Sequence, residues 1–572
     1  MGSVLVAASA VLSACATERT AGIGPEGTRS LQTPNERSVD ALPSTIRAEE
    51  GAFAALAAKV PSSAGYYIAA DGSTVLLVRD TADASRARQA FDAVKPANHR
   101  HFVRSTGIRI VKAQYSFGQL ATWRDAIAEN AGEGMVGIRS LDLDEVRNRV
   151  VVGIDRRAVE STTANVRRFL TQVNIDAQAV FVEPVDEVVL AAGAERHASS
   201  ARKLGALMTS GRLLGHQWPA LAGGVLILTS ATPSQTPAAG GQGPCSIGFT
   251  AQYTPSSGAS YRAVVTATHC TAVWGAPDNT TFAQNFLSVA GTATVDPHKY
   301  NCSGNWCRAS DAAMFQLAPE MPSELGLIVR TTFNSTTTAI GSVEQDTQSP
   351  WFVITSATTG SIPVGATYHK MGWVGGWTTG YRYQSCVDLW LGNWPDAFVT
   401  RCADRGTAEN QPGDSGGSVF VRLDSNNVSL IGTTVGNIGG DHVYSPYSRV
   451  ASDMGGTMVV TRPATLTEPV LTSSLVGGHA NVTWPGVSGA SEYQVFVQEV
   501  WQQCDEYWGC SLTYGPETKY TVTGTTWQDS RNTFIAAYVD PNGPHMRVRV
   551  KANNPLGASF STFSPHVLFS LP

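Results

Sequence analysis

The stretch PGDSGGS, residues 412–418, sets one serine among three glycines and is the most informative segment of the 572-residue chain. A serine hydroxyl is a weak nucleophile unless a base takes its proton and hydrogen-bond donors receive the oxyanion that forms. Glycines beside the serine let the backbone turn tightly, so that successive N–H groups can point at one place. The stretch therefore indicates a nucleophile at Ser415, with the N–H groups of Gly413 and Ser415 as oxyanion donors. The alternative is a surface turn rich in glycine and serine.

Two segments upstream carry the side chains that a nucleophilic serine requires. VVTATHC, residues 264–270, is an apolar strand that ends in small residues and then presents His269. SDAAMFQL, residues 310–317, opens an apolar strand with Asp311, and a buried carboxylate needs partners. We predict that His269 is the base for Ser415 and that Asp311 orients its imidazole. The alternatives are a structural histidine at a strand end and an aspartate that caps a strand.

These segments follow one another in the order His, Asp, Ser, which is the order of the chymotrypsin arrangement. With GG at 223–224, CSIGF at 245–249 and WTTG at 377–380, they make residues 223–455 resemble the chymotrypsin-like serine peptidases, nearest the α-lytic/streptogrisin branch. The resemblance implies an all-β, trypsin-like domain over 223–463, built from two six-stranded barrels with the triad between them. It also implies a serine endopeptidase that hydrolyses proteins or peptides through an acyl-enzyme, with no metal or cofactor.

The same resemblance indicates which residues bind substrate. It implies that Val435, Gly436 and Asn437 form one wall of the specificity pocket, although the family usually has serine where Val435 stands. Glu409 lies six residues before Ser415, where trypsin-like enzymes carry an acidic residue at the pocket base. A carboxylate there favours Lys or Arg in the substrate, while the alternative is a solvated loop carboxylate. The cleavage preference therefore stays open.

The region before the peptidase-like domain has a different texture. Residues 48–185 contain no cysteine and alternate helical with strand patterns, which predicts an α+β domain. Ser116 precedes one helical pattern and is a candidate N-cap. YSFGQL at 115–120 and NRVVV at 148–152 resemble the pro-regions of the same branch, which implies a folding catalyst and inhibitor within a zymogen. The alternative is a permanent accessory domain.

Two segments read as linkers around this α+β domain. Residues 16–47 are largely rich in Gly, Pro, Thr and Ser, and residues 186–222 join the domain to the peptidase-like one. Arg202 and Arg212 in the second linker are candidate processing points. Nothing in the sequence fixes the cut.

The first 15 residues predict export. Residues 4–14 form an apolar run too short to span a bilayer, and the run ends in LSAC at 12–15. This ending resembles the bacterial lipoprotein signal, which implies a lipid on Cys15 and a protein anchored outside a bacterial cell. The alternative is an ordinary secretory signal with an accidental match. No later segment reaches about 20 apolar residues, so we predict no spanning helix.

Residues 464–572 predict a C-terminal β-sandwich. ANVTW at 480–484 and MRVRVK at 546–551 alternate apolar and polar residues with the period of a strand. The region resembles a fibronectin type III module, in which Trp484 is expected in the core. An insert at 501–510 carries three aromatic residues, Trp501, Tyr507 and Trp508, around two cysteines that we expect to pair. It is either a contact surface for a partner or a local disulfide staple.

Cysteine usage points to an oxidising compartment. The cysteines beyond Cys15 form four sequential pairs, with no CxxC pair and no histidine cluster at zinc spacing. The simplest account is four disulfides, as in secreted proteins, although connectivity does not follow from sequence. The eight residues are Cys245, Cys270, Cys302, Cys307, Cys386, Cys402, Cys504 and Cys510.

Composition limits the classes of function. The length suggests three or four domains. A net charge of −5 gives no reason to expect nucleic acid or an acidic membrane surface as a partner. One rival to a peptidase is a catalytically silent homologue that acts as a surface binding or adhesion protein through its C-terminal module. Another rival is an esterase that acts on non-peptide substrates.

Overall fold

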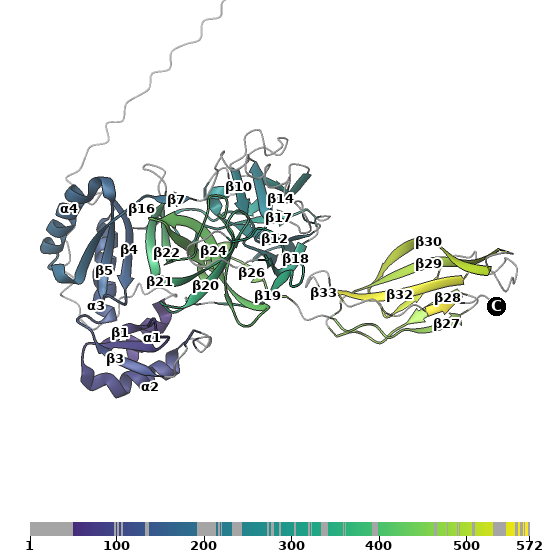
Figure 1. The fold of residues 1–572 in the computed structure, drawn as a ribbon, viewed down its shortest axis with the longest axis horizontal. Helices are drawn as coiled ribbons and strands as arrows, with labels where there is room; N and C mark the ends of the chain where they lie inside the picture. Colours follow the sequence, from purple (N-terminus) through teal and green to yellow (C-terminus); the bar gives the residue numbers. More distant parts are fainter. Residues whose placement is uncertain are drawn as a thin grey trace, which may run out of the picture.

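Our computed structural model describes residues 50–569 with gaps, of which the longest are 191–212, 231–242, 333–340 and 530–544. The described chain is β-rich with few helices and forms three successive parts. Figure 1 shows a mixed helix-and-strand part at the N-terminal end, a large central β part, and an elongated β part at the C-terminal end. A multi-domain, β-rich protein is what the sequence predicted.

The N-terminal part contains two small three-stranded groups, each covered by helices. In the first, β1 and β2 are antiparallel and β2 and β3 are parallel; in the second, β4 and β5 are antiparallel and β5 and β6 are parallel. Ser116 is the N-cap of α3 and forms a capping box. Its hydroxyl accepts a hydrogen bond from the Gln119 amide, and the Gln119 side-chain oxygen accepts one from the Ser116 amide. The elements are α1 (Gly51–Lys59), β1 (Ser63–Ile68), β2 (Thr74–Val78), η3 (Thr81–Asp83), α2 (Ala84–Val94), β3 (Ile108–Lys112), α3 (Phe117–Asn130), β4 (Ile138–Asp144), β5 (Arg149–Asp155), η5 (Arg156–Ala158), α4 (Val159–Gln172), η6 (Ala177–Ala179) and β6 (Val180–Val185).

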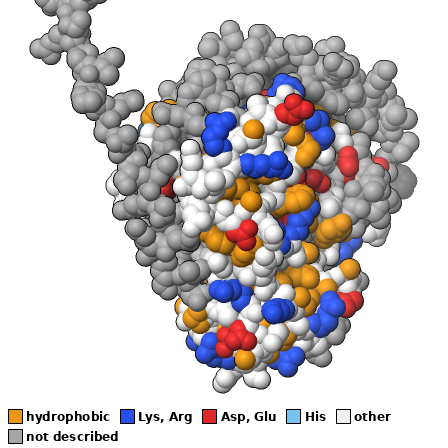
Figure 2. All heavy atoms as spheres, turned by 90° about the vertical axis from the view of Figure 1, so that its left-hand side faces the viewer, with side chains coloured by type: hydrophobic (Ala, Val, Ile, Leu, Met, Phe, Trp, Pro, Cys, Tyr) orange, Lys and Arg blue, Asp and Glu red, His pale blue; other side chains and the backbone are white. Residues whose placement is uncertain are grey.

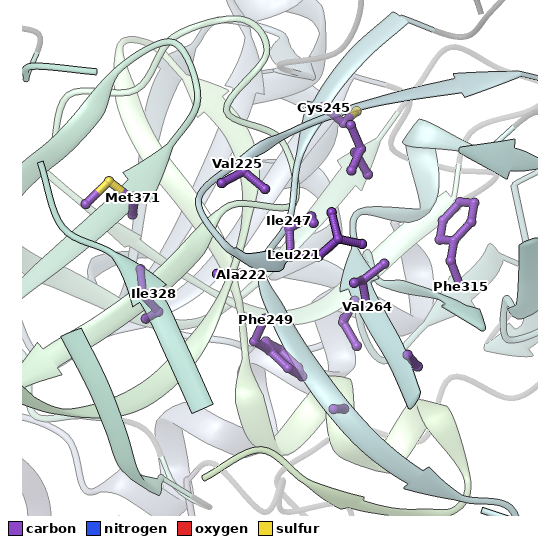
Figure 3. Packing of buried hydrophobic residues seen from close by; sticks show 14 of the residues in the cluster. Leu221, Ala222, Val225, Cys245, Ile247, Phe249, Val264, Phe315, Ile328 and Met371 are labelled. Atoms are coloured by element: carbon purple, nitrogen blue, oxygen red, sulfur yellow. The ribbon is translucent and has the colours of Figure 1, made fainter. Parts of the chain in front are cut away.

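The central part begins with an eight-stranded sheet whose inner face holds the largest apolar core. Strands β9, β11 and β12 contribute side chains such as Phe249 and Val264, which pack with Phe315 (Figure 3). Full burial of such side chains supplies about 1.5–3 kcal/mol each. In sheet order the strands are β10 (Gly243–Ser246), β9 (Leu226–Ser230), β13 (Thr281–Gln284), β14 (Ser288–Val295), β17 (Ala313–Leu317), β12 (Tyr261–Thr266), β11 (Phe249–Thr254) and β26 (Thr457–Val459).

The second sheet of the central part has fifteen strands and continues into the N-terminal part. The main order of strands is β15 (Tyr300–Cys302), β16 (Asn305–Arg308), β22 (Phe398–Gly406), β25 (Asp441–Pro446), β24 (Asn427–Ile438), β23 (Ser418–Arg422), β20 (Thr367–Gly372), β21 (Gly376–Leu391), β4, β5 and β6. Four further strands pair with this sheet outside the main order: β7 (Val188–Leu190), β8 (Leu221–Gly223), β18 (Ser323–Val329) and β19 (Trp351–Ala357). Six strands of the sheet, β22, β25, β24, β23, β20 and β21, close into a ring because β21 also pairs with β22, and this ring has the strand number of one expected barrel. Beyond the ring, β21 pairs with β4, so that the sheet also takes in β5 and β6. Helices η8 (Thr268–Cys270) and α6 (Tyr447–Met454) complete the part.

The C-terminal part consists of a three-stranded and a five-stranded sheet. Trp484 is buried in the core of this part, as expected, and Tyr493 is buried beside it. The strands are β27 (Thr472–Val476), β28 (His479–Thr483) and β31 (Thr526–Gln528) in one sheet, and β30 (Gly509–Val522), β29 (Glu492–Asp505), β32 (His545–Asn554), β33 (Ser559–Phe560) and β34 (Val567–Phe569) in the other.

Three of the four sequential cysteine pairs are disulfides in the structure. They are Cys245–Cys270, Cys302–Cys307 and Cys386–Cys402. Cys504 stands opposite Cys510 in the register of β29 and β30, but their side chains are outside the described residues.

Several sequence predictions concern residues that the structure does not describe. The signal-like segment 1–15 with Cys15, the linker 16–47, and the candidate processing points Arg202 and Arg212 all lie outside the described residues. None of the described helices is long and apolar enough to cross a bilayer.

Candidate active site

Three side chains predicted from the sequence meet in one hydrogen-bonded chain. His269 lies on η8, directly after β12. Its Nδ1 is 2.6 Å from Asp311 Oδ2, and its Nε2 is 2.7 Å from Ser415 Oγ. All three side chains are almost fully buried. The imidazole therefore stands between a carboxylate and a hydroxyl, although the three residues are far apart in sequence.

Asp311 is fixed by contacts on both sides of it. The His269 amide donates to Asp311 Oδ1 at 3.3 Å, and the Asp311 amide donates to Ser445 Oγ at 3.0 Å. The preceding Ser310 donates both its amide and its hydroxyl to Asp453 Oδ2, at 2.7 and 2.6 Å. Burial raises the pKa of Asp453, while the two Ser310 hydrogen bonds act in the opposite direction. The carboxylate of Asp311 thus has little freedom to turn away from the imidazole.

A buried ion pair joins the histidine turn to the aspartate turn. Arg308 Nη1 donates to Asp296 Oδ1 at 2.7 Å and to Thr268 Oγ1 at 2.6 Å, and its Nη2 donates to the Ala312 carbonyl at 2.9 Å. Thr268 and Ala312 are the immediate neighbours of His269 and Asp311 in sequence. Because Arg308 and Asp296 are fully buried, this ion pair is not screened by solvent.

Replacing Arg308 by Met is expected to slow the reaction of Ser415 with a fluorophosphonate by about 10- to 100-fold. Loss of the guanidinium leaves Asp296 without its cation and removes the contact with Ala312, although Thr268 still donates to Asp296 at 2.6 Å. A misplacement of about 1 Å at such a site can cost about 100-fold. The matched control is Arg462→Met, since Arg462 pairs with Glu324 at a half-exposed site where an ion pair contributes about 0–1 kcal/mol. Equal kinetics for the two variants would remove any role for Arg308.

The loop that carries Ser415 has the strained backbone that its glycines permit. Gly413 has φ of +105° and Gly416 has φ of +79°, both in the region that L side chains rarely adopt. The Gly416 amide donates to the Thr434 carbonyl at 2.8 Å, and the Ser415 carbonyl accepts from the Ser246 amide at 2.8 Å. The turn therefore has fixed backbone bonds on both sides of the nucleophile.

Two amides of this loop are left available. Within the described part of the chain, no group accepts a hydrogen bond from the N–H of Gly413 or Ser415, whereas the N–H groups of Asp414 and Gly417 donate to backbone carbonyls. Such a pair of uncommitted donors beside a hydroxyl is the arrangement that an oxyanion requires.

A second buried ion pair anchors the serine loop. Lys370 Nζ contacts Asp414 Oδ2, and both side chains are fully buried. Asp414 Oδ1 also accepts from the Val374 and Gly375 amides at 3.0 and 2.8 Å, and its Oδ2 accepts from the Gln411 amide at 3.0 Å. The carboxylate next to Ser415 is thus held by one cation and three backbone donors.

Of the residues predicted to bind substrate, Val435 lies against Ser415, while Asn437 and Glu409 contact the loop that precedes it. Val435 is fully buried, and its carbonyl lies 3.5 Å from Ser415 Oγ. Asn437 exchanges side-chain contacts with Asn410, whose Nδ2 lies 3.2 Å from Asn437 Oδ1. Glu409 is half-buried, and its Oε1 accepts from Gln411 Nε2 at 2.8 Å. Glu409 is therefore neither fully solvated nor ion-paired among the described residues.

Strand β24 also receives a strand from outside the peptidase-like region. β7 (Val188–Leu190) pairs antiparallel with Gly436, Asn437 and Ile438. Just before β7, Val185 packs into an apolar cluster that includes Val435 and Ile438. The backbone edge that follows Val435 is therefore covered by the chain segment that leaves the N-terminal part.

Several residues at the site gave no signal in the sequence. The Trp274 ring lies 6.3 Å from the His269 ring and 6.0 Å from the Phe398 ring, both edge-on. His442 lies on β25 opposite Asn437 of β24, with Nε2 3.2 Å from Thr434 Oγ1. Burial, together with the positive charge of Lys370, holds the pKa of His442 well below its ordinary value. Their importance depends on contacts across the fold, which no local pattern records.

Comparison with known proteins gives solved structures of serine proteases and fibronectin type III-like modules. Protease A of Thermobifida fusca is 17% identical, covers 42% of this chain and 99% of its own, and has a TM-score of 0.29. The chymotrypsin of Cellulomonas bogoriensis is 21% identical, with 42% and 100% covered and a TM-score of 0.28. A Fn3-like protein from Clostridium thermocellum is 23% identical, with 20% and 96% covered and a TM-score of 0.13.

These likenesses are weak in overall geometry. No protein-family model matches the chain, and no curated protein matches it.

Proposed function

We propose that this chain is a serine endopeptidase that acts on protein or peptide substrates, with Ser415 as nucleophile. The observation that carries the proposal is the continuous hydrogen-bonded chain from Asp311 through His269 to Ser415. Each of the three side chains is buried, so their polar atoms are paired with one another and not with bulk water.

The mechanism follows from the chemistry of these groups. His269 Nε2 takes the proton of Ser415 as Oγ attacks the peptide carbonyl, and the amides of Gly413 and Ser415 receive the oxyanion. Asp311 holds the Nδ1–H tautomer and stabilises the imidazolium. The protonated His269 then passes its proton to the leaving amine, and water hydrolyses the acyl-enzyme by the same route in reverse.

The substrate backbone is proposed to lie along β24. The residues at 435–437 offer an open strand edge once β7 is absent, and an extended peptide can add to such an edge by main-chain hydrogen bonds. Val435 and Asn437 then flank the substrate, and Glu409 follows in the adjoining loop. Glu409 favours a basic residue at the cut only if its contact with Gln411 opens.

The rival functions are separated by substrate and by variant. The active preparation is expected to hydrolyse casein, and Ser415→Ala is expected to lose this activity by about 10⁶-fold. Turnover of p-nitrophenyl esters without casein cleavage would favour an esterase. Absence of both activities in a correctly folded chain would favour a surface binding protein.

We infer that the N-terminal part restrains the peptidase within a zymogen. This inference is supported by β7, which pairs with the edge of β24 at Gly436, Asn437 and Ile438. Sequencing of the mature N-terminus after secretion tests this inference. A start beyond residue 190 is expected, whereas a mature active chain that keeps residues 48–185 would make the N-terminal part a permanent accessory domain.

Export is part of the proposal. The three disulfides support an oxidising compartment outside the cell. Lipid attachment at Cys15 and a surface partner for the C-terminal module stay predictions from the sequence.

A further inference from the structure

The N-terminal part is joined to the central part by a continuous sheet. Leu141 of β4 stands opposite Asp388 of β21, and Ser140 stands opposite Leu389. A second contact lies nearby, where the Ile68 amide donates to the Val364 carbonyl at 2.8 Å. The two parts therefore share backbone hydrogen bonds, and separating them exposes both strand edges.

Strand β4 directs opposite kinds of side chain to its two faces. Leu141 and Leu143 belong to the apolar core of the N-terminal part. Ser140, Asp142 and Asp144 alternate with them and point to the other face. In a single domain such a polar face meets water, but here Asp142 is only 1% exposed.

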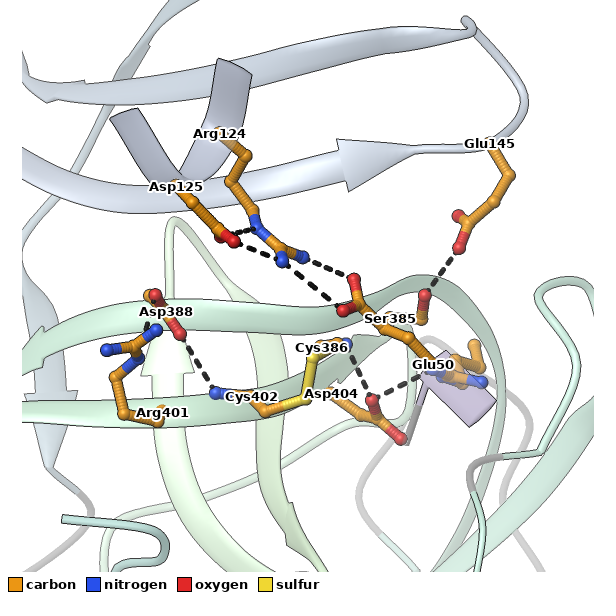
Figure 4. The surroundings of a disulfide bond; sticks show 11 residues. Glu50, Arg124, Asp125, Glu145, Ser385, Cys386, Asp388, Arg401, Cys402 and Asp404 are labelled. Atoms are coloured by element: carbon orange, nitrogen blue, oxygen red, sulfur yellow. Dashed lines mark hydrogen bonds and ion pairs between the residues drawn. A yellow bond between two sulfur atoms is a disulfide. The ribbon is translucent and has the colours of Figure 1, made fainter. Parts of the chain in front are cut away.

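The burial of Asp142 is not offset by hydrogen bonds. Neither of its carboxylate oxygens has a hydrogen-bond partner among the described residues. Glu145, in the turn after β4, is also buried; its Oε1 accepts from Ser385 Oγ of β21 at 2.6 Å, and its Oε2 has no partner among the described residues. Figure 4 shows Glu145 reaching toward Ser385 beside the Cys386–Cys402 disulfide. An ionised carboxylate in such surroundings is costly, whereas a neutral carboxyl is much less so.

The cations that act on Asp142 and Glu145 pair with other carboxylates, and Arg382 Nε, Arg405 Nε and Arg405 Nη1 have no hydrogen-bond partner among the described residues. Arg382 donates to Asp404 at 2.9 Å and Arg405 donates to Asp441 at 3.0 Å, all within the central part. Charged or titratable groups that act on Asp142 and Glu145 are Asp144 on β4, Tyr66 on β1, Arg382 on β21 and Arg405 on β22.

We propose that the N-terminal part stays docked on the central part only while Asp142 and Glu145 are neutral, so that the contact loosens as pH rises. The outer face of the N-terminal part gives the contrast: there, acidic and basic side chains lie interspersed at the surface (Figure 2). Carboxylates of that kind remain ionised in water in the docked and the undocked state alike. Only the acids that face the central part change their surroundings on release.

The direction of the effect follows from the two states. Burial raises the pKa of Glu145 to about 8 and raises the pKa of Asp142 well above its ordinary value. Once released into water, both carboxyls return to ordinary pKa values of about 4. Between these limits the docked state holds more protons than the released state. Docking therefore weakens by a factor of about 10 per pH unit for each proton held, from about pH 4 up to about pH 8.

Hydrogen exchange of the full chain carrying Ser415→Ala measures the contact directly, because that chain cannot cut itself. Peptides that cover residues 138–144 and 385–391 report on β4 and β21, and residues 261–266 in the central core report on global unfolding. The parent is compared at each pH with Asp142→Asn/Glu145→Gln, so that the chemical exchange rate cancels. We expect the parent to lose protection at the contact by about 10-fold or more per pH unit between pH 6 and pH 8, relative to the double variant.

The uncharged isosteres separate this proposal from ordinary ion pairing. If both acids are neutral when docked, Asn and Gln keep the contact closed at pH 8. If the acids are ionised and bound to Arg382 or Arg405, the double variant loses protection even at pH 6, which would overturn the proposal. Equal protection of the parent at pH 6 and pH 8 would overturn it as well. Glu160→Gln, an exposed change on α4, is expected to behave as the parent does.

The consequence for activity rests on the proposed function, but the exchange measurement does not. If the chain is a peptidase restrained by β7, release of the N-terminal part at higher pH also frees the edge of β24. If the chain has no peptidase activity, the exchange result is unchanged, so the two proposals fail independently.

Discussion

Asp311→Asn is expected to lower kcat for peptide hydrolysis by about four orders of magnitude while leaving the fold intact. Asp311 Oδ2 lies 2.6 Å from His269 Nδ1 and accepts a hydrogen bond from the Nδ1–H group. An amide in the same place can present its NH₂ group to Nδ1, which forces the proton onto Nε2. His269 Nε2, the atom that faces Ser415, then has no free lone pair to receive the hydroxyl proton.

Steady-state kinetics of the purified active preparation measure this effect, with Asp424→Asn as the matched control. Asp424 caps an exposed turn through the Asn426 and Asn427 amides, so its replacement leaves the site untouched. A loss of less than 10-fold for Asp311→Asn would show that the histidine tautomer does not matter, and the proposed mechanism would be wrong.

Lys370→Met is expected to lower the free energy of unfolding by about 3–5 kcal/mol, because it leaves the buried Asp414 carboxylate without its cation. The same change is expected to loosen the serine loop, since Asp414 directly precedes Ser415. Urea denaturation in a Ser415→Ala background measures the stability without self-cleavage.

A lysine of a different kind serves as the control for Lys370. Lys95 pairs with Asp92 at the surface at 2.6 Å, with both side chains about half exposed, so Lys95→Met is expected to cost about 0–1 kcal/mol. Adding Asp414→Asn to Lys370→Met removes the unpaired charge and is expected to restore part of the loss. Equal denaturation midpoints for Lys370→Met and the parent would mean that the ion pair does not hold the loop.

Sequence patterns identified the candidate site residues because these residues lie in short local motifs. The glycines around Ser415 and the strand ends at His269 and Asp311 each leave a visible signature. Their meeting in space was expected only through the family resemblance, since spacing along the chain does not fix it. The capping box at Ser116 was predictable for the same local reason.

The supporting contacts were not predictable, because each depends on residues from separate elements. Arg308 and Lys370 read as ordinary charged residues within strands, and only the fold reveals that they are fully buried against Asp296 and Asp414. The pairing of β7 with β24 depends on a three-residue segment with no pattern of its own.

Strand β4 shows where alternation misleads. In SLDLD at 140–144 polar residues occupy every second position, which normally indicates a face turned to water. The structure covers that face with the central part and buries Asp142. Alternation reports which face is polar; it cannot report that a second domain covers it.

The most direct test of the proposed function is the site of reaction with a fluorophosphonate. The active preparation is treated with the probe and digested, and the adduct is located by mass spectrometry. We predict one adduct, on Ser415, and none in His269→Ala. Labelling that persists in Ser415→Ala, or an absence of labelling in a folded and processed chain, would contradict a nucleophilic serine at this position.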